Sequence, residues 1–355
     1  MDWRSERITT FRYMRTDRTT RQDIEELDCF EEGGSIEYND LTAIKVSGSL
    51  PYIKLPEIGN DYIRVYSRHI QKGKVHEVLH GTFIASAPSS VLNRKSRKGS
   101  LDIYSLLQVI QDASISVPLS IPKNTQAVAF AVTMITGRTG ISALGLVVQS
   151  DASTAKLSSD WVYDIGTSRL EIINDLLAFA GFKNADVDAS GTIRMLAFTN
   201  PEELSPTVVL RDDEPGCMFA PSVKHELDFF SVPNVFVAVM SNSEASLVAK
   251  AENTDPTSIY SKQSRGREIV VKEDVSDIEN QTALDTFARR RLTELSSSVE
   301  TVEITHPWLS YDMGVGMQLI YTEAAFEMAG VVVKRVLGLT PAMICVASIR
   351  RFVRR

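Results

Sequence analysis

The chain has 355 residues, of which 43% are hydrophobic and 23% charged, and its formal net charge is −7. That length accommodates roughly two or three domains, and a mean hydropathy of −0.06 argues against a helical membrane protein. The three cysteines lie far apart without CxxC spacing, which excludes a disulfide framework and a zinc site built from thiolates alone. The acidic balance also argues against a dedicated nucleic-acid-binding protein, whose surface would be basic.

The first part of the chain, between about residues 35 and 86, is predicted to form β-strands. Residues 62–69 alternate with period two and are rich in β-branched and aromatic side chains. Gly73 supplies the left-handed backbone of a hairpin turn at 71–74, after which 75–85 returns as the partner strand. One face of the first strand carries Ile63, Val65, Ser67 and His69.

Helices are predicted in the middle of the chain. A basic loop at 93–98 precedes a helix that follows Ser100, and a second helix is expected at 124–136, ended by Gly137. The apolar residues of the first helix, at helical spacing, are Ile103, Leu106, Leu107 and Ile110.

A capped helix that begins after Ser168 is the clearest local prediction. Ser168 and Glu171 form a capping box, and Gly181 ends the helix. Because an apolar stripe runs along this helix, we expect Ile173 and Leu177 to be core residues.

Strands return after Pro206 and are interrupted by one long helix, which follows a second capping box at 276–279 and spans about 283–295. The predicted strands are 235–240, 247–251, 268–272, 299–306, 317–322, 330–337 and 345–353. Strands in runs, rather than strands that alternate singly with helices, favour a mainly β, α+β fold of antiparallel barrels or sandwiches with helical insertions.

The sharpest chemical motif is His76-Glu77-Val78-Leu79-His80, which matches the HExxH pattern of zinc metallopeptidases. On a helix the two imidazoles lie about 6 Å apart and reach one zinc ion, whose water the glutamate activates. On a strand the same spacing covers ~13 Å, too far for one tetrahedral ion. The motif lies between Gly73 and Gly81, opposite an alternating strand, so we expect a strand with two surface histidines and no zinc.

A second motif, D-x-D-x-S-G at 186–191, resembles the start of a calcium loop. The twelfth position of such a loop needs a bidentate glutamate, and this chain has Ala197 there. Aspartate and Ser-Gly are typical of tight turns. We therefore predict a hairpin at 184–196 that turns at 188–191, without a bound cation.

Cys217 and His225 lie near each other in sequence and suggest a thiolate–imidazole pair, but a buried cysteine and a surface histidine are the favoured interpretation. The sequence has no G-x-S-x-G elbow, no phosphate-binding P-loop and no G-x-G-x-x-G after a strand. We therefore predict no catalytic, cofactor-binding or metal-binding residues and no enzyme activity.

Several segments, taken in their order along the chain, point to a known family. They are 47–50, 59–66, 81–86, 163–182, 188–191, 233–237, 261–267, 283–295, 303–308 and 314–321. This order resembles that of bacteriophage tail hub proteins, also called baseplate hub or tail-tip proteins. The resemblance covers most of the chain, from about residue 2 to the end; the single motifs are loose and their order is the more specific feature.

The resemblance implies two tail-tube-like antiparallel β-barrels joined by α/β insertions. A first barrel domain is expected at 1–92, an α/β insertion region at 93–205, and a second barrel domain with one long helix at 206–355. Three such chains would place six barrels in a ring.

The resemblance also implies a structural virion component without a cofactor: a tail hub that closes the distal end of the tail tube and forms a channel for DNA ejection. Its expected partners are two further copies in a homotrimer, the distal tail protein or tail tube, the tape-measure protein, and tail-tip or fibre proteins. DNA would be bound only in transit, and the chain would not insert into a membrane. The expected location is the tail tip or baseplate of the virion, after assembly in the host cytoplasm.

Two alternatives stay open. A zinc metallopeptidase requires His76, Glu77 and His80 to lie on a helix. A receptor-binding module at a tail tip is suggested by the strand-rich halves and by Trp161 and Trp308, although an aromatic content of 8% without a clustered platform argues against it.

Overall fold

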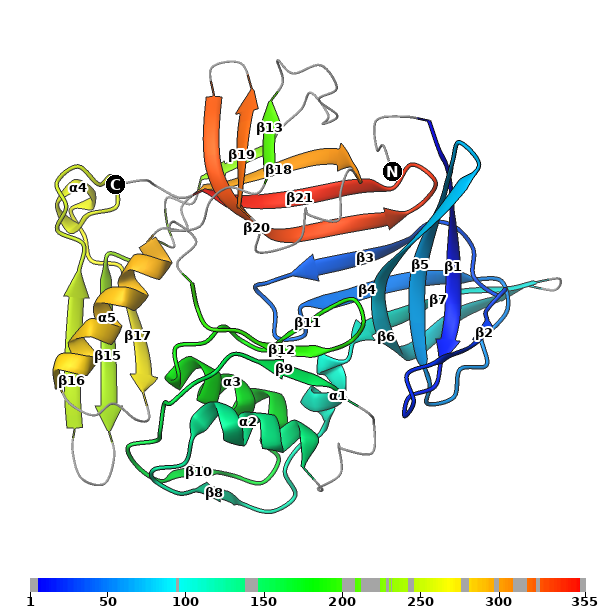
Figure 1. Cartoon of the computed structure of the whole chain (residues 1–355). Helices are drawn as coiled ribbons and strands as arrows, with labels where there is room; N and C mark the ends of the chain where they lie inside the picture. Colours follow the sequence, from blue (N-terminus) through cyan, green and yellow to red (C-terminus); the bar gives the residue numbers. More distant parts are fainter. Residues whose placement is uncertain are drawn as a thin grey trace.

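The computed structural model shows a mainly β protein (Figure 1). The structure describes residues 6–93, 96–137, 146–199, 208–211, 224–227, 230, 232–241, 246–275, 281–296, 300–308, 318–323 and 326–351. Most of its strands pair antiparallel, which confirms the predicted mainly β, antiparallel class. Within these ranges, no helix is long and apolar enough to cross a bilayer.

The largest sheet has 13 strands and combines strands from both ends of the chain. Its order is β14-β18-β21-β20-β3-β4-β7-β6-β5-β1-β2, and β13 joins through β19, which pairs with β20. The amino-terminal strands are β1 (Ile8–Thr16), β2 (Asp23–Glu26), β3 (Gly34–Asn39), β4 (Val46–Tyr52), β5 (Tyr62–Gln71), β6 (Lys74–Asn93) and β7 (Ser96–Ser105). The carboxyl-terminal strands are β13 (Val208–Arg211), β14 (Lys224–Leu227), β18 (Glu300–Pro307), β19 (Gln318–Glu323), β20 (Phe326–Leu339) and β21 (Ile344–Arg351).

An antiparallel ladder between β3 and β20 joins the two groups of strands, pairing residues 34–39 with 334–339. Ile36 and Leu337 lie opposite each other in this ladder, and both are fully buried in one shared core. The strands expected in two separate barrels therefore belong to one continuous sheet. Among the described strands no pairing closes this sheet, whose path ends at β14 and β2, so the two closed barrels stay a prediction.

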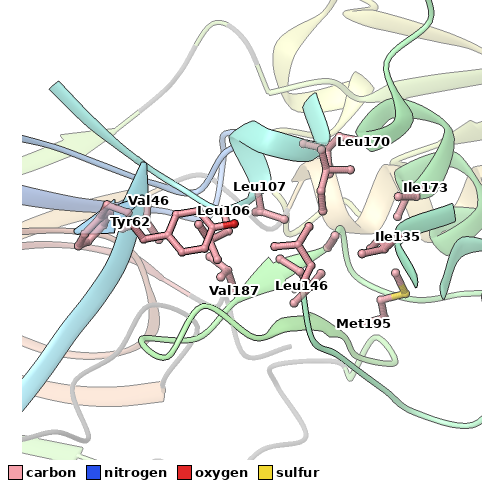
Figure 2. Packing of buried hydrophobic residues seen from close by; sticks show 14 of the residues in the cluster. Val46, Tyr62, Leu106, Leu107, Ile135, Leu146, Leu170, Ile173, Val187 and Met195 are labelled. Carbon is pink, nitrogen blue, oxygen red and sulfur yellow. The ribbon is translucent and has the colours of Figure 1, made fainter. Parts of the chain in front are cut away.

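An α/β region lies between the two groups of strands in sequence and packs against the same core. Its elements are α1 (Leu107–Asp112), β8 (Leu119–Ile121), α2 (Ala127–Thr136), β9 (Val148–Ser150), β10 (Trp161–Tyr163), α3 (Arg169–Phe179), β11 (Asp186–Val187) and β12 (Ile193–Met195). Figure 2 shows Leu106 and Leu107 between Val46 and Tyr62 of the large sheet and Leu170 of α3. The core of this region is thus continuous with that of the sheet.

A smaller unit has its own core. Its strands are β15 (Val235–Ser241), β16 (Ser246–Glu252) and β17 (Val270–Val275), with α4 (Lys262–Arg265) before β17 and α5 (Gln281–Ser296) packed on one face of the sheet (Figure 1). The buried residues between α5 and the sheet are Phe236, Ala238, Met240, Ala249, Ala251, Leu284, Ala288 and Leu292. The predicted long helix and its apolar face are confirmed, whereas its predicted capping box at 276–279 lies outside the described residues.

The helix predicted after Ser100 is only partly correct. β7 continues to Ser105, and α1 begins at Leu107. Leu101 and Ile103 point into the core from β7, which pairs with β4 and β6. Their burial at every second position shows a strand, and pairing with two neighbours outweighed the apparent helical spacing.

The basic loop predicted at 93–98 is wrong for the described residues, because β6 extends to Asn93 and β7 begins at Ser96. The predicted hairpin turn, the end of the second helix and the capped helix are confirmed. The turn between β5 and β6 has Lys72 and Gly73 at φ of 50° and 76°, the left-handed values that a two-residue hairpin requires. α2 ends at Thr136 before Gly137, and Ser168 Oγ accepts a hydrogen bond of 3.1 Å from the backbone N–H of Glu171 at the start of α3. Ile173 and Leu177 are fully buried.

Replacing Leu177 by Ala is expected to lower the free energy of unfolding by about 2–5 kcal/mol, because a large buried side chain is lost and a cavity remains. Ser168→Ala removes the side-chain cap of α3 and should lower the free energy of unfolding by about 1 kcal/mol. The matched control is Ala178→Ser on the exposed side of α3, which should change stability by less than about 0.5 kcal/mol. Urea unfolding measures all three, and an effect of Leu177→Ala as small as that of the control would contradict the placement.

Candidate functional site

The HExxH residues lie on strand β6, as predicted, and not on a helix. His76 pairs with His69 of β5, and the Glu77 carboxylate accepts a hydrogen bond of 2.9 Å from Arg12 Nη1. The ladder is irregular beyond this point, because Leu79 pairs with Tyr66 and the next pair is Gly81 with Val65. His80 is therefore the extra residue of a β-bulge. It lies on the same face of β6 as the buried Val78, two residues earlier.

His80 is buried, so its expected placement on the surface was wrong. Its Nε2 lies 2.7 Å from Ser67 Oγ, and the same hydroxyl lies 2.8 Å from Nε2 of the fully buried His69. His69 Nδ1 lies 3.1 Å from Thr9 Oγ1. A single hydroxyl proton can be donated to only one of the two imidazoles, so Ser67 donates to one and accepts from the other.

Trp308, which follows β18, packs against both histidines of this group. Its ring stacks on His69 with centroids 5.5 Å apart and meets His80 edge-on at 5.2 Å. Its backbone N–H donates to the Met343 carbonyl at 2.8 Å, and its own carbonyl accepts from Arg7 Nη2 at 3.4 Å. We call Thr9, Ser67, His69, His80 and Trp308 the histidine–tryptophan cluster; it joins β1, β5 and β6 to the carboxyl-terminal strands.

Burial keeps both imidazoles of the cluster neutral. It lowers the pKa of His69 to about 4, with smaller contributions from Arg7 and His76. It lowers the pKa of His80 to about 3, and the positive charge of Arg335 acts in the same direction. At neutral pH the cluster is therefore an uncharged hydrogen-bonded network.

The arrangement does not form a peptidase site. Glu77 is paired with Arg12 and half-exposed, whereas His80 points into the core from the bulge. Within the part of the chain that the structure describes, no three His, Cys, Asp or Glu side chains come together as metal ligands. The cluster is a buried set of hydrogen bonds and ring contacts that holds β1, β5 and β6 against the carboxyl-terminal strands.

The calcium-like motif forms the predicted hairpin turn between β11 and β12. Asp188 Oδ1 accepts hydrogen bonds from Ser190 Oγ at 2.6 Å and from the Thr192 backbone N–H at 2.9 Å. Asp186 forms an ion pair of 2.6 Å with Arg194. The carboxylates are thus used within the hairpin, as a plain turn requires.

The same turn docks the α/β region on the large sheet. Arg21 donates to the Ser190 carbonyl at 2.6 Å, and Thr82 donates to the Ala189 carbonyl at 3.0 Å. Gly191 adopts φ of +82°, and a Cβ at this position would lie 2.4 Å from the Arg21 side chain. Only glycine fits this close approach without a shift of the neighbouring residues.

The pair suggested by Cys217 and His225 is not placed by the structure. Cys217 lies outside the described residues, and of His225 only the backbone is described, where it pairs with Val302 in β14. The sequence analysis had also missed Ser67 and His69 as members of a site. The signal was present, because both polar residues occupy the otherwise apolar face of β5.

The zinc prediction has a direct test. After metal-free purification, elemental analysis should find well under one zinc per chain, because His76 and His80 do not converge on one ion. A tightly bound equivalent that is lost in a His80→Ala variant would contradict the strand geometry.

The cluster also predicts a pH dependence. Between the ordinary histidine pKa of about 6.5 and the lowered values of about 4 and 3, the unfolded chain binds more protons than the folded chain. The free energy of unfolding should therefore fall as pH drops below 6.5, by up to about 1.4 kcal/mol per pH unit for each histidine, and should be insensitive to these groups above pH 7. Urea unfolding at several pH values should show a shallower slope for His80→Gln than for the wild type; equal slopes would disprove the assignment.

Comparison with known proteins places this geometry in a wider context. No family model matches the sequence, and no curated protein matches it. Solved structures with a similar fold include a tail protein from Neisseria meningitidis, with 13% identity, a TM-score of 0.69 and coverage of 98% of this chain and 97% of that one. The 43 kDa tail protein of prophage MuSo2 from Shewanella oneidensis has 9% identity, a TM-score of 0.66 and coverage of 96% and 98%.

The prophage tail protein gp18 from Listeria monocytogenes is similar as well, with 12% identity, a TM-score of 0.58 and coverage of 99% of this chain and 96% of that one. At such identities the likeness is one of fold, and it extends over nearly the full length of each protein. The chain therefore has the fold of phage tail proteins, which confirms at the level of fold the resemblance to tail hub proteins found in its sequence.

Proposed function

We propose that this chain is the structural hub of a phage-type tail, which closes the distal end of the tail tube and surrounds a channel for DNA ejection. The observation that carries the proposal is the match of fold over nearly the whole of this chain and nearly the whole of each tail protein. In this proposal the protein is a part of the virion, at the tail tip or baseplate, and acts without a cofactor.

We infer an architecture of two tube-like parts whose strands meet in the continuous sheet. In the proposed division, 1–92 forms the first barrel domain, 93–205 the α/β insertion region, and 206–355 the second barrel domain. The ladder between β3 and β20 connects the first and second domains edge to edge, and β7 leads from the first domain into the insertion region. Two such parts in each of three chains give a ring of six.

The ends of the sheet support association with further chains. β2 and β14 are the terminal strands of its path, and each has one described partner strand. Unpaired strand edges are an aggregation hazard unless another chain or element covers them. We propose that neighbouring copies, the distal tail protein or tail tube, the tape-measure protein and tail-tip or fibre proteins supply that cover.

A receptor-binding module is the weaker candidate. Trp161 and Trp308 were the aromatic residues that suggested it, and their exposed fractions are 8% and 2%. Trp161 packs edge-on against Phe179 of α3, and Trp308 packs in the histidine–tryptophan cluster. Buried rings cannot form a binding platform, so a structural hub accounts better for the arrangement.

The proposal predicts a homotrimer with a central opening. Light scattering coupled to gel filtration should give a mass near three times 39.3 kDa, or a monomer that shifts to this mass when the distal tail protein is added. A closed ring is expected because it lets every copy cover its exposed strand edges with the same kind of contact to a neighbour.

Electron micrographs provide the control, since a trimer of this kind must appear as a ring with a hole wide enough for duplex DNA. A chain that stays monomeric with all tail partners present, and that shows no ring, would rule out the hub and favour the receptor-binding candidate.

A further inference from the structure

The end of the large sheet at which β5 turns into β6 carries an apolar row next to exposed cations. Ile8, Ile70 and Val75 lie side by side on β1, β5 and β6, on the face that points away from the core. Ile8 is 64% exposed and Val75 48%. We call this surface the basic tip; it consists of that row and of the exposed cations Arg68, Lys72 and Lys74.

The cations of the basic tip differ from those farther along the same strands. Arg12 pairs with carboxylates of β2 and β6, and Arg64 pairs with Asp23. Among the described residues no ion pair neutralises any of the three cations of the tip. Of the two carboxylates at this end of the strands, Glu77 is held by Arg12, and only Glu6 adds negative charge. The basic tip therefore keeps an excess of positive charge.

A second surface, on the α/β region, has the opposite character. After β10 the Thr167 backbone N–H donates to the Asp164 carbonyl at 3.2 Å and closes a turn, within which Ile165 is 63% exposed. The segment before β8 runs beside this turn, because the Ile115 backbone N–H donates to the Thr167 carbonyl at 3.0 Å. Val117 of that segment is 67% exposed. We call this surface the acidic patch; it consists of Val117, Ile165 and the exposed carboxylates Asp164, Glu171 and Asp175.

The carboxylates of the acidic patch have no ion-pair partner among the described residues. Asp175 accepts a hydrogen bond of 3.1 Å from the Tyr163 hydroxyl. Burial raises the pKa of Tyr163, and the negative charges of Asp175 and Glu171 raise it further. Arg169 is the one cation between residues 164 and 175. The acidic patch therefore keeps an excess of negative charge.

We infer that the basic tip of one copy binds the acidic patch of the next copy in the assembled ring. This inference rests on the trimer of the hub function proposed above and adds the residues of its contact. The two surfaces lie apart on one chain, with β5 and β6 at the right of Figure 1 and β8 and β10 at its bottom, so they do not meet within a copy. A closed ring of this kind joins one surface of each copy to a different surface of its neighbour.

The two surfaces are complementary in both of their components. The apolar row of the basic tip would cover the exposed Val117 and Ile165, which removes apolar area of both copies from water. The three cations of the tip would meet three carboxylates of the patch, each group without an ion pair in its own chain. Charge complementarity of this kind determines which surfaces associate, and like charges placed opposite each other prevent association.

Charge reversal in the full chain tests the contact, under the conditions in which the wild-type chain forms the trimer. Lys72→Glu with Lys74→Glu reverses the charge of the basic tip. Asp164→Lys with Glu171→Lys reverses that of the acidic patch. A combined variant carries all four changes. Light scattering coupled to gel filtration measures the mass, and thermal unfolding monitored by circular dichroism shows that each variant is folded.

The matched control is Lys54→Glu with Lys156→Glu, since both lysines are exposed and belong to neither surface. It changes the net charge by the same amount as the reversal of the basic tip, and it should keep the trimer. Each single reversal is expected to lose the trimer and elute as a monomer. The combined variant is expected to regain the trimer, because every contact then has an acidic tip against a basic patch, whereas a misfolded variant would not be rescued.

A trimer that persists in either single reversal, or a combined variant that does not regain it, would overturn the inference and leave the hub function standing. A wild-type chain that stays monomeric with the distal tail protein present would overturn the hub function and the inference together.

Discussion

The ladder between β3 and β20 is the interaction on which the rest of the structure depends. It brings residues 34–39 against 334–339 and so allows side chains from both ends of the chain to share one core. β3 is also held closely on its other side, where a Cβ on Gly48 of β4 would lie 2.4 Å from the Ser35 carbonyl oxygen. The continuous sheet and the contacts around Trp308 both follow from this pairing.

Local elements could be predicted because their causes lie within a few residues. Gly73 favours the left-handed backbone of the turn between β5 and β6, and Ser168 accepts the hydrogen bond that caps α3. The class of fold followed from such segments taken together. The helix expected after Ser100 begins only at Leu107, because residues 100–105 pair with β4 and β6, and partners distant in sequence leave no mark in local spacing.

The candidate site was less predictable than the fold. The sequence correctly assigned His76 and His80 to a strand, but the placement of His80 on the surface was wrong. His80 lies two residues after the buried Val78 and so points to the same, core-facing side of β6. Ser67 and His69 gave a usable hint, because buried polar residues on an apolar face need partners. Their partner Trp308 is supplied by the far end of the chain, and only the folded sheet reveals it.

The shared core has a consequence for biosynthesis. A nascent chain that has emerged only as far as β7 presents β3 as an open strand edge and leaves Ile36 without its cover, since β20 is made near the end of translation. Contacts of such long sequence separation form slowly and expose apolar surface until they do. Chains cut short before β20 would therefore be prone to aggregate, because the open edge of β3 and the apolar surface around Ile36 stay exposed.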